Sequence, residues 1–258
     1  MTLDLFARPA LLFLPASNPR AIAKARDSGA DIAVLDLEDA VKAGDKAAAR
    51  AAAVAAVAEP WAMPVAIRIN GVGTPEYDHD LAAALGSSCD LIIVPMVDQP
   101  LAITGKPVAA MIETAAGVLV APAIARTVRA LIVGTNDLAA SLNLPAIERR
   151  SMGFALQSAV VAARAAGIAV FDGVFNQLDD PHGLASECAD SRALGFDGKS
   201  LIHPDQIVPC QEAFAPSAAA VARAQRLVAA ASGGAERFEG AMIEEMHVAA
   251  ARRLLTSR

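Results

Sequence analysis

The sequence predicts a (β/α)₈ barrel, and three patterns support this fold class. Short aliphatic runs alternate with longer Ala-rich amphipathic stretches along most of the 258 residues, as expected for repeated strand–helix units. Eight such runs occur, the number that closes a barrel. Hydrophobic residues make up 55% of the chain and aromatic residues only 4%, which suits Ala-rich helices packed on aliphatic strands. An open doubly wound sheet shares the alternation, but no GxGxxG follows the first run and no P-loop occurs.

The individual elements are bounded by capping residues. Helix starts are marked by a capping residue followed by proline, because Ser, Thr and Asn cap helices and proline favours the first helical position. The sequence has Ser17 or Asn18 before Pro19, and Thr74 before Pro75. Three glycines stand where helices should end: Gly29, Gly167 and Gly195. We expect strands at 11–16, 32–37, 65–70, 91–96, 108–113, 130–135, 168–173 and 198–204, and helices that include 19–28, 45–58, 146–166 and 182–194.

The chain divides into a barrel and a C-terminal extension. We assign residues 1–214 to the barrel and 215–258 to a helical extension. Two helices of the extension are joined through "SGGAERFEG", a Gly-rich segment that we interpret as a hinge. The last helix is therefore expected to form part of a lid.

Composition and charge exclude several classes of function. The net charge of −6 comes without a basic stripe, so nucleic acid is not an expected partner. No run of uncharged apolar residues is long enough to span a bilayer, so no membrane partner is expected either. Three widely spaced cysteines fit a reducing cytoplasm better than a disulfide framework. No two of the four histidines have metal-ligand spacing, which argues against zinc.

Polar residues follow most of the predicted strands. Asp36, Glu38 and Asp39 end the second strand, and Arg68 and Asn70 belong to the third. Because active sites of such barrels lie at the C-terminal ends of the strands, we expect these side chains to meet at one mouth. Later strands bring further polar residues to the same end: Glu113, Asn136, Asp137, Asp172, Lys199 and His203.

Glu113 and Asp137 are the candidate metal ligands. They follow adjacent strands and have no His or Cys partner, and hard oxygen donors favour Mg²⁺ or Mn²⁺ over zinc. Water and a chelating substrate would complete the coordination. The alternative is that each acid merely caps the helix that follows it.

Arg68 is a charged residue inside an otherwise apolar strand. A buried guanidinium needs an anionic partner, either Glu38 or Asp39 or a substrate carboxylate, and both kinds of contact can coexist. Lys199 is the one lysine predicted in a strand, which raises the alternative of a Schiff-base lysine. The metal-type carboxylates argue against that alternative, because they provide another means of stabilising an enolate.

Several stretches together resemble one enzyme family. They are "LFLPASNPRAIAKARDSGADIAVLDLEDAV", "IRING", "MIETAAG", "VGTNDLAASL" and "GFDGKSLIHPDQI". From about residue 10 to the C-terminus they resemble the HpcH/HpaI aldolase superfamily, in particular citrate lyase β-subunits and malyl-CoA-type lyases. The resemblance implies a (β/α)₈ barrel that forms a homotrimer or hexamer, with Mg²⁺ held by Glu113 and Asp137.

The resemblance also assigns roles to residues around the mouth. Arg68 would grip the carboxyl or carbonyl end of the substrate, with Glu38 and Asp39 as neighbouring catalytic carboxylates. Arg20, with Lys24, would meet the phosphates of coenzyme A near a helix N-terminus. Asp36 and Asn70, at the same strand ends, are also expected to bind the substrate.

The implied reaction is the cleavage or formation of a C–C bond beside a thioester, as in citryl-, malyl- or citramalyl-CoA lyases. In relatives with this C-terminal tail the acid or base is an Asp in a "G-x-M-I-D" motif, carried by the lid of a neighbouring subunit. This chain has "EGAMIEEM", which puts Glu244 at that position. A side chain longer by one methylene puts efficiency in question, because catalysis is sensitive to small misplacements. A second departure is Ala16, where relatives often have Gly.

Four functions remain open from the sequence. The first is a Mg²⁺-dependent C–C lyase acting on a small 2-hydroxyacyl-CoA thioester. The others are a metal-dependent aldolase acting on a free hydroxy-oxo acid, an acyl-CoA thioesterase, and a non-catalytic subunit of a lyase complex. A citrate lyase β-subunit would also require an acyl-carrier protein as a partner.

Overall fold

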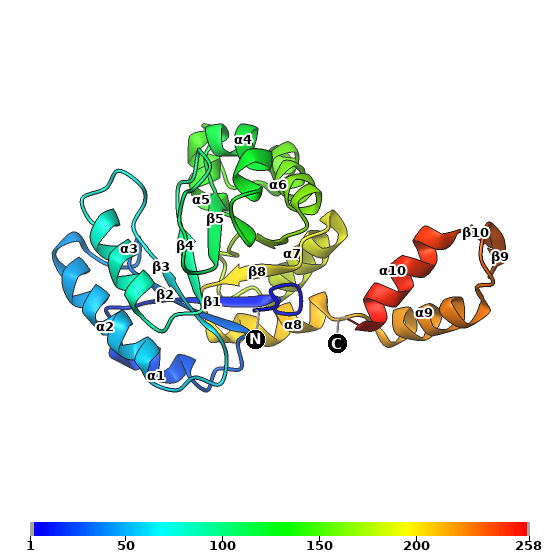
Figure 1. Cartoon of the computed structure of the whole chain (residues 1–258), viewed down its shortest axis with the longest axis horizontal. Helices are drawn as coiled ribbons and strands as arrows, with labels where there is room; N and C mark the ends of the chain where they lie inside the picture. Colours follow the sequence, from blue (N-terminus) through cyan, green and yellow to red (C-terminus); the bar gives the residue numbers. More distant parts are fainter. Residues whose placement is uncertain (1–2, 257–258) are drawn as a thin grey trace. The chain divides into compact units, whose positions relative to one another are not determined.

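The structure is a computed structural model that describes residues 3–256 and separates into two compact units. The division falls between Phe214 and Ala215. Figure 1 shows the course of the chain from the strands and helices of the first unit to the final helices of the second. Each unit has its own apolar core and is described separately below.

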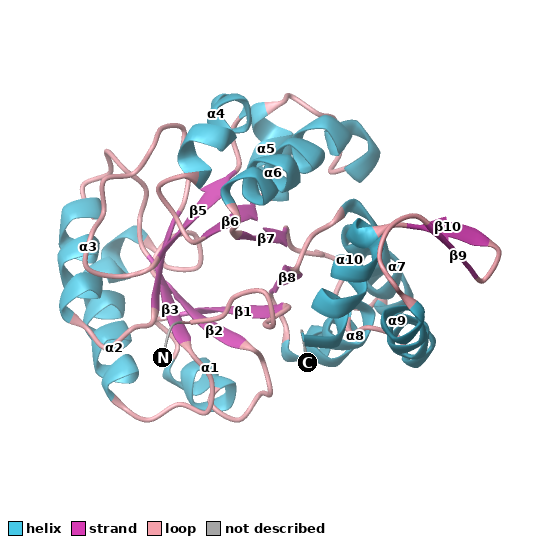
Figure 2. Ribbon diagram, turned by 45° about the vertical axis from the view of Figure 1, so that its right-hand side comes forward, coloured by secondary structure: helices cyan, strands magenta, loops and turns pink. Residues whose placement is uncertain are grey.

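The first unit is a closed barrel of eight parallel strands, in which each strand pairs with the next along the chain and β8 pairs with β1. Figure 2 shows the strands surrounded by helices. The predicted (β/α)₈ fold and all eight predicted strands are therefore confirmed. The strands are β1 Ala10–Pro15, β2 Ile32–Asp36, β3 Val65–Arg68, β4 Leu91–Val94, β5 Val108–Ile112, β6 Ala130–Val133, β7 Ala169–Asp172 and β8 Gly198–Leu201.

The helices of this unit begin and end mostly where capping residues predicted. Asn18 caps α1 by accepting hydrogen bonds from two backbone N–H groups, and Gly167 and Gly195 end their helices in the left-handed conformation. The helix expected at Pro75 begins later, at Tyr77, because Thr74 bonds back to the Gly71 carbonyl in a turn. The helices are α1 Pro19–Ala25, α2 Lys46–Ala58, α3 Tyr77–Gly86, α4 Ala115–Ala125, α5 Thr135–Ser141, α6 Gly153–Ala166, α7 Pro181–Leu194 and α8 Ile207–Phe214.

One connection departs from the strand–helix alternation. Residues 95–107, between β4 and β5, contain no helix. Pro95, Pro100 and Pro107 explain this difference, because proline lacks the N–H that a helix interior requires. In the same segment Met96 has a left-handed φ of 53°, an unusual conformation for a residue with a side chain.

Packing on both faces of the strands positions the mouth residues. Val34 and Ala66 belong to the apolar cluster inside the barrel, whereas Leu35 and Ile67 pack against the surrounding helices. Side chains alternate along a strand, so Asp36 and Arg68 have the same inward direction as Val34 and Ala66. Both polar side chains therefore point into the C-terminal mouth.

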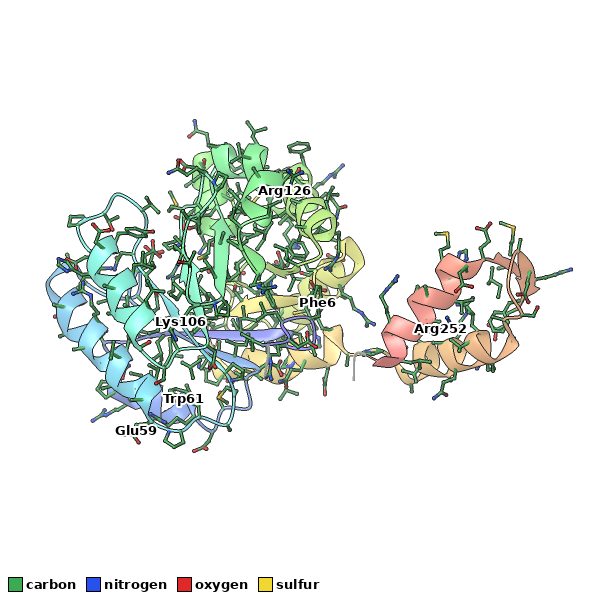
Figure 3. All side chains as sticks on the ribbon, in the orientation of Figure 1. Phe6, Glu59, Trp61, Lys106, Arg126 and Arg252 are labelled. Atoms are coloured by element: carbon green, nitrogen blue, oxygen red, sulfur yellow. The ribbon has the colours of Figure 1, made fainter. Side chains whose placement is uncertain are left out.

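The turn between α2 and β3 is fixed by the single tryptophan of the chain. Trp61 lies at the outer surface close to Glu59 (Figure 3), and its indole N–H donates to the Ala56 carbonyl at 2.9 Å. The Arg26 guanidinium covers the ring at 4.5 Å and donates to the Pro60 carbonyl. These contacts join α1 to the segment that leads into the strand of Arg68.

The N-terminal rim of the barrel repeats one hydrogen-bond arrangement. Before β2, β4 and β8 an aspartate carboxylate accepts the N–H of a residue in the preceding strand at 2.8–2.9 Å. The three pairs are Asp31 with Ala10, Asp90 with Val65 and Asp197 with Val170. Before β6 this position is Arg129, whose side chain makes no hydrogen bond or ion pair with another described residue.

The second unit contains two helices and a β-hairpin. The helices are α9 Ala218–Ala230 and α10 Glu245–Thr256, and the strands are β9 Glu236–Phe238 and β10 Ala241–Ile243. The two helices of the extension agree with the prediction, but part of the segment interpreted as a Gly-rich hinge is this hairpin. Its turn residues, Glu239 and Gly240, both have positive φ, as two-residue hairpin turns require. Within residues 3–256 no helix is both long and apolar enough to cross a membrane.

Candidate functional site

A cavity of about 390 Å³ opens at the C-terminal ends of the barrel strands. Polar side chains from β2, β3 and β8 line it, together with residues that follow β5, β6 and β7. Residues predicted for the mouth are among them: Asp36, Asp39, Arg68, Glu113, Asn136 and Asp137. The barrel therefore brings together six of the predicted residues from four separate stretches of sequence.

Asp36 and Arg68 form a buried two-point ion pair. The Arg68 Nε and Nη2 atoms lie 2.7 and 2.6 Å from the two carboxylate oxygens of Asp36. The same carboxylate accepts the backbone N–H groups of Glu38 and Ala40. Burial alone would lower the pKa of Arg68, but the hydrogen bonds that it donates to Asp36 hold that pKa above its ordinary value. Arg68 is therefore a fixed positive charge with a set orientation.

Glu38 and Asp39 lie on the remaining side of the guanidinium. The Arg68 Nη1 atom is 2.6 Å from Glu38 Oε2 and 3.6 Å from Asp39 Oδ2. Burial raises the pKa of Glu38 to about 8, although the charge of Arg68 acts in the opposite direction. Three carboxyl groups thus surround one arginine, and Glu38 can hold a proton near neutral pH.

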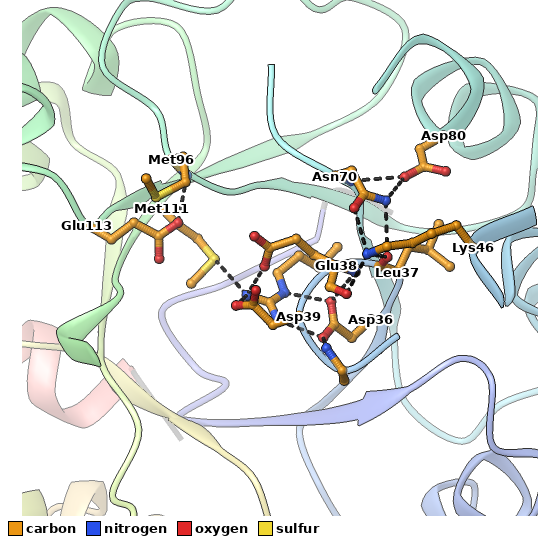
Figure 4. Close-up of polar contacts among 12 residues, drawn as sticks. Asp36, Leu37, Glu38, Asp39, Lys46, Asn70, Asp80, Met96, Met111 and Glu113 are labelled. Carbon is orange, nitrogen blue, oxygen red and sulfur yellow. Dashed lines mark hydrogen bonds and ion pairs between the residues drawn. The ribbon is translucent and has the colours of Figure 1, made fainter. Parts of the chain in front are cut away.

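Behind this cluster lies a polar layer that does not line the cavity. Asn70 donates to the Leu37 carbonyl at 3.0 Å and to Asp80 at 2.5 Å, and Lys46 donates to the Leu37 carbonyl, the Glu38 carbonyl and the Asn70 side chain. Figure 4 shows this layer on one side of the acidic cluster and Glu113 on the other. Asn70 therefore supports the loop after β2 instead of facing the mouth as expected. The role of Lys46 had no signal in the sequence, because it begins an ordinary Ala-rich helix.

Glu113 is buried with one oxygen unpaired. Its Oε1 accepts the Met96 N–H at 2.6 Å, while its Oε2 is buried without a hydrogen-bond partner. A Cβ at Gly134 would overlap Oε2, so a glycine is required there. Burial raises the pKa of Glu113 to about 7, although the Met96 N–H lowers it; the Asp137 charge raises it further.

Asp137 lies in the first turn of α5 and is largely exposed; its partial burial and the charge of Asp39 raise its pKa. Among residues 3–256 no group of three or more His, Cys, Asp or Glu side chains is placed to hold a metal ion. A cation at Glu113 and Asp137 would therefore take its other ligands from water and substrate. The unpaired Oε2 of Glu113 and the all-oxygen donor set fit Mg²⁺.

Two hydroxyl groups that the sequence did not indicate also face the cavity. Thr135 and Ser200 are each 2% exposed, and their hydroxyl oxygens are buried without a hydrogen-bond partner. Both line the cavity. The available signal was the inward direction of Ser200 in β8, next to the outward-facing Lys199.

Asp172 and Lys199 lie outside the mouth, contrary to expectation. The Lys199 ammonium, which is fully buried, contacts Asp172 at 2.8 Å and Glu187 of α7 at 2.5 Å. Burial would raise the pKa of Asp172, but Lys199 and Arg149 hold it below its usual range. These side chains point outward from their strands, so they join the barrel to α7. A Schiff base at Lys199 has no support from this geometry.

Among the remaining predicted residues, those of the first unit do not line the cavity. Arg20 and Lys24 are exposed on α1 and do not line it. The side chain of His203 caps the short helical turn after β8. Glu244 belongs to the second unit, where its side chain is exposed and its backbone N–H donates to His247 Nδ1 at 2.9 Å.

Curated proteins with similar sequences are enzymes or enzyme-like proteins. The chain is 38% identical over 264 residues to a (3S)-malyl-CoA thioesterase of Cereibacter sphaeroides, covering 95% of this chain and 92% of that protein. It is 34% identical over 251 residues to a citrate lyase subunit beta-like protein of Mycobacterium tuberculosis, covering 92% and 91% of the two chains.

Solved structures show the same architecture. The CitE protein of Mycobacterium tuberculosis, in complex with magnesium, acetoacetate and coenzyme A, superposes with a TM-score of 0.86 at 32% identity. The alignment covers 98% of this chain and 99% of that one. RipC of Yersinia pestis superposes with a TM-score of 0.74 at 30% identity, covering 84% of this chain and 99% of that one. The HpcH/HpaI aldolase/citrate lyase family matches residues 9–105 and 101–204. The chain belongs to this family of enzymes.

Proposed function

We propose that the chain is a Mg²⁺-dependent C–C lyase that cleaves or forms a small 2-hydroxyacyl-CoA thioester of the citryl, malyl or citramalyl type. One observation carries the proposal: the unpaired, buried Oε2 of Glu113 lies in a cavity that Asp137 and the fixed charge of Arg68 also line. The complex of CitE with magnesium, acetoacetate and coenzyme A supports the same ligand chemistry.

Glu113 and Asp137 are the residues proposed to hold the cation. When bound, Mg²⁺ would act as a Lewis acid on the oxygen of a 2-hydroxy or 2-oxo acid. Gly134 leaves room for Glu113, and the Met96 N–H fixes its orientation through Oε1. One oxygen of Glu113 is thus held by the protein, and the other is left for the cation.

Arg68 is proposed to stabilise negative charge that develops on the acyl side of the reaction. Its Nε and Nη2 groups are held by Asp36, so the guanidinium keeps one orientation throughout. A preorganised charge in a site that excludes water stabilises a transition state more than a mobile one does. Asp36 therefore acts as the positioning residue of Arg68.

Two carboxyl groups are proposed for proton transfer to the carbon released from the thioester. Glu38 lies at the guanidinium of Arg68, and burial raises its pKa to about 8, so its carboxyl group carries a proton near neutral pH. Glu244 corresponds to the tail acid that the family resemblance implies, supplied by a neighbouring subunit of a trimer or hexamer. Arg20 and Lys24 remain the proposed contacts for the coenzyme A phosphates.

Thioester hydrolysis is the second candidate function. The 38% identity to a (3S)-malyl-CoA thioesterase over most of both chains favours it. The same cavity would bind the same substrate, with a carboxylate such as Asp39 activating water. The two functions differ in their products.

A product assay tests both functions. The purified protein is incubated with malyl-, citramalyl- and citryl-CoA, with and without Mg²⁺. A lyase releases a 2-oxo acid together with an acyl-CoA, whereas a thioesterase releases free coenzyme A and the intact hydroxy acid. Loss of either activity in Glu113→Ala supports the proposed cation ligand, and its loss in Glu244→Gln supports the tail acid. A parallel incubation contains free hydroxy-oxo acids. Cleavage of these acids, with no cleavage of the thioesters, would instead identify an aldolase.

The non-catalytic alternative predicts no turnover in that assay. The assay is repeated with the same acids bound to an acyl-carrier protein. This tests whether the chain acts on a thioester of that protein instead of one of coenzyme A. If no thioester is cleaved in either form, the proposed enzymatic function is wrong for these substrates.

A further inference from the structure

We propose that the hydroxyl groups of Thr135 and Ser200 bind the free carboxylate of the small 2-oxo or 2-hydroxy acid part of the substrate. The inference deepens the proposed function and rests on it, because it takes such an acid to be the ligand. It assigns carboxylate recognition to two residues outside the cluster of acids around Arg68.

The first step of the argument is the unpaired state of both hydroxyls. Each residue is 2% exposed, and each hydroxyl oxygen is buried without a partner while lining the cavity. Buried polar groups are nearly always hydrogen-bonded, and leaving one unpaired costs free energy. Two such groups in one cavity therefore indicate that a polar ligand group completes them.

The second step is the space between the two residues. Thr135 lies against Gly173, where a Cβ would overlap its hydroxyl oxygen. Asp172 pairs with Lys199 in the barrel, which places Gly173 beside Ser200 in the register. The two hydroxyls thus flank a residue with no side chain, and the Thr135 side chain occupies the space that a side chain at Gly173 would take.

The third step is the charge around Arg68. The donors of Arg68 are directed to Asp36, and two further carboxyl groups, Glu38 and Asp39, lie at its Nη1. A substrate carboxylate placed there would meet more negative than positive charge. In the strand order β6 lies opposite β2, and β1 separates β8 from β2, so Thr135 and Ser200 stand outside the strand and loop that carry these acids.

A carboxylate fits these two hydroxyls better than other polar groups do. Each hydroxyl donates one hydrogen bond, and a carboxylate offers two coplanar acceptor oxygens with a charge that strengthens both bonds. An ester or amide of the same acid offers one acceptor and no charge. Pyruvate is therefore expected to bind more tightly than methyl pyruvate or pyruvamide.

Binding of pyruvate to the Mn²⁺-loaded protein, measured by calorimetry, tests the inference without turnover. Ser200→Ala and Thr135→Val should each weaken pyruvate binding about tenfold or more, since hydrogen bonds to charged groups are among the stronger ones. Mn²⁺ affinity should stay unchanged. The melting temperature without ligand should not fall, because each variant removes a polar atom that has no partner. Ser200→Thr and Thr135→Ser should retain pyruvate binding.

Ser191→Ala is the matched control. Ser191 is equally buried, but its hydroxyl contacts Asp172 and the Glu187 carbonyl, so its removal should lower the melting temperature and leave pyruvate affinity unchanged. If wild-type protein binds pyruvate and both test variants bind it equally well, this inference is wrong while the proposed function stands. If wild-type protein binds neither Mn²⁺ nor pyruvate, both are wrong.

Discussion

Lowering the pH from 8 to 6 should weaken the binding of Mg²⁺ or Mn²⁺ to the chain by about a factor of ten. The reason is the state of Glu113, whose burial raises the pKa of its carboxyl group to about 7 in the ligand-free protein. A cation needs the carboxylate form, so below that pKa it must displace a proton.

The magnitude follows from the pKa and the fraction of carboxylate. At pH 6 roughly one Glu113 in eleven is ionised, whereas at pH 8 nearly all are, which gives a ratio of about ten. The raised pKa of Asp137 adds an effect of the same sign at more acidic pH. The shift of Glu113 from 4.5 to about 7 corresponds to about 3 kcal/mol against the charged form.

The same shift determines how stability changes with pH. Because the folded state holds the Glu113 proton more tightly than the unfolded state, this residue makes the ligand-free protein less stable as pH rises from about 4.5 to about 7. Mg²⁺ relieves the cost of the charged form. The gain in melting temperature on adding Mg²⁺ should therefore increase between pH 6 and pH 8.

Mn²⁺ titration followed by electron paramagnetic resonance in non-chelating buffers measures the affinity directly. Glu113→Gln removes the titrating group, so its residual affinity should be weaker and should lose most of its pH dependence in this range. A wild-type affinity that stays constant between pH 6 and pH 8, or that rises at low pH, would refute the assignment of Glu113 as a ligand.

Three further substitutions test other parts of the fold and the site. Gly134→Ala should abolish Mn²⁺ binding while circular dichroism shows a retained fold, because its Cβ would displace Glu113 Oε2; normal binding would contradict this. Asp36→Ala should lower the free energy of unfolding by about 3 kcal/mol in urea titrations, since it leaves Arg68 buried without its two-point partner; a loss within experimental error would show that other acids suffice. Arg129→Asp should raise that free energy by about 1 kcal/mol, because aspartate at the three equivalent positions accepts a strand N–H; a lower value would exclude such an acceptor there.

The barrel could be predicted because its strands are unusually uniform. Each aliphatic run is bounded by capping or turn residues, and alternation places one side inward, so strand order and the inward direction of Arg68 followed together. The connection at residues 95–107 could not be predicted with the same rule, because the rule assigns a helix to every gap of sufficient length. Its prolines were visible in the sequence and carried the signal that the connection is irregular.

Side-chain direction explains both the successes and the errors at the site. Asp36 and Arg68 have inward positions in their strands and lie in the mouth, as expected. Asp172 and Lys199 also occur at strand ends, but they have outward positions and pair with α7. Counting polar residues at strand ends therefore includes residues from both faces, and only the register of alternation separates them. In β8 this alternation predicts that Ser200 points into the barrel and that Lys199 points outward.

The charges around Arg68 give a physical reason for a cation in this fold. One guanidinium faces Asp36, Glu38 and Asp39, and Glu113 and Asp137 line the same cavity. A single positive charge cannot balance so many carboxylates. Burial raises the pKa of Glu38 to about 8 and that of Glu113 to about 7, and neighbouring carboxylates act in the same direction. In the ligand-free protein, protons reduce the excess negative charge. A divalent cation would take over that role at Glu113, and the substrate carboxylate would then meet a less negative cavity. Cation and acid should therefore bind cooperatively, with pyruvate affinity rising as Mn²⁺ saturates the site.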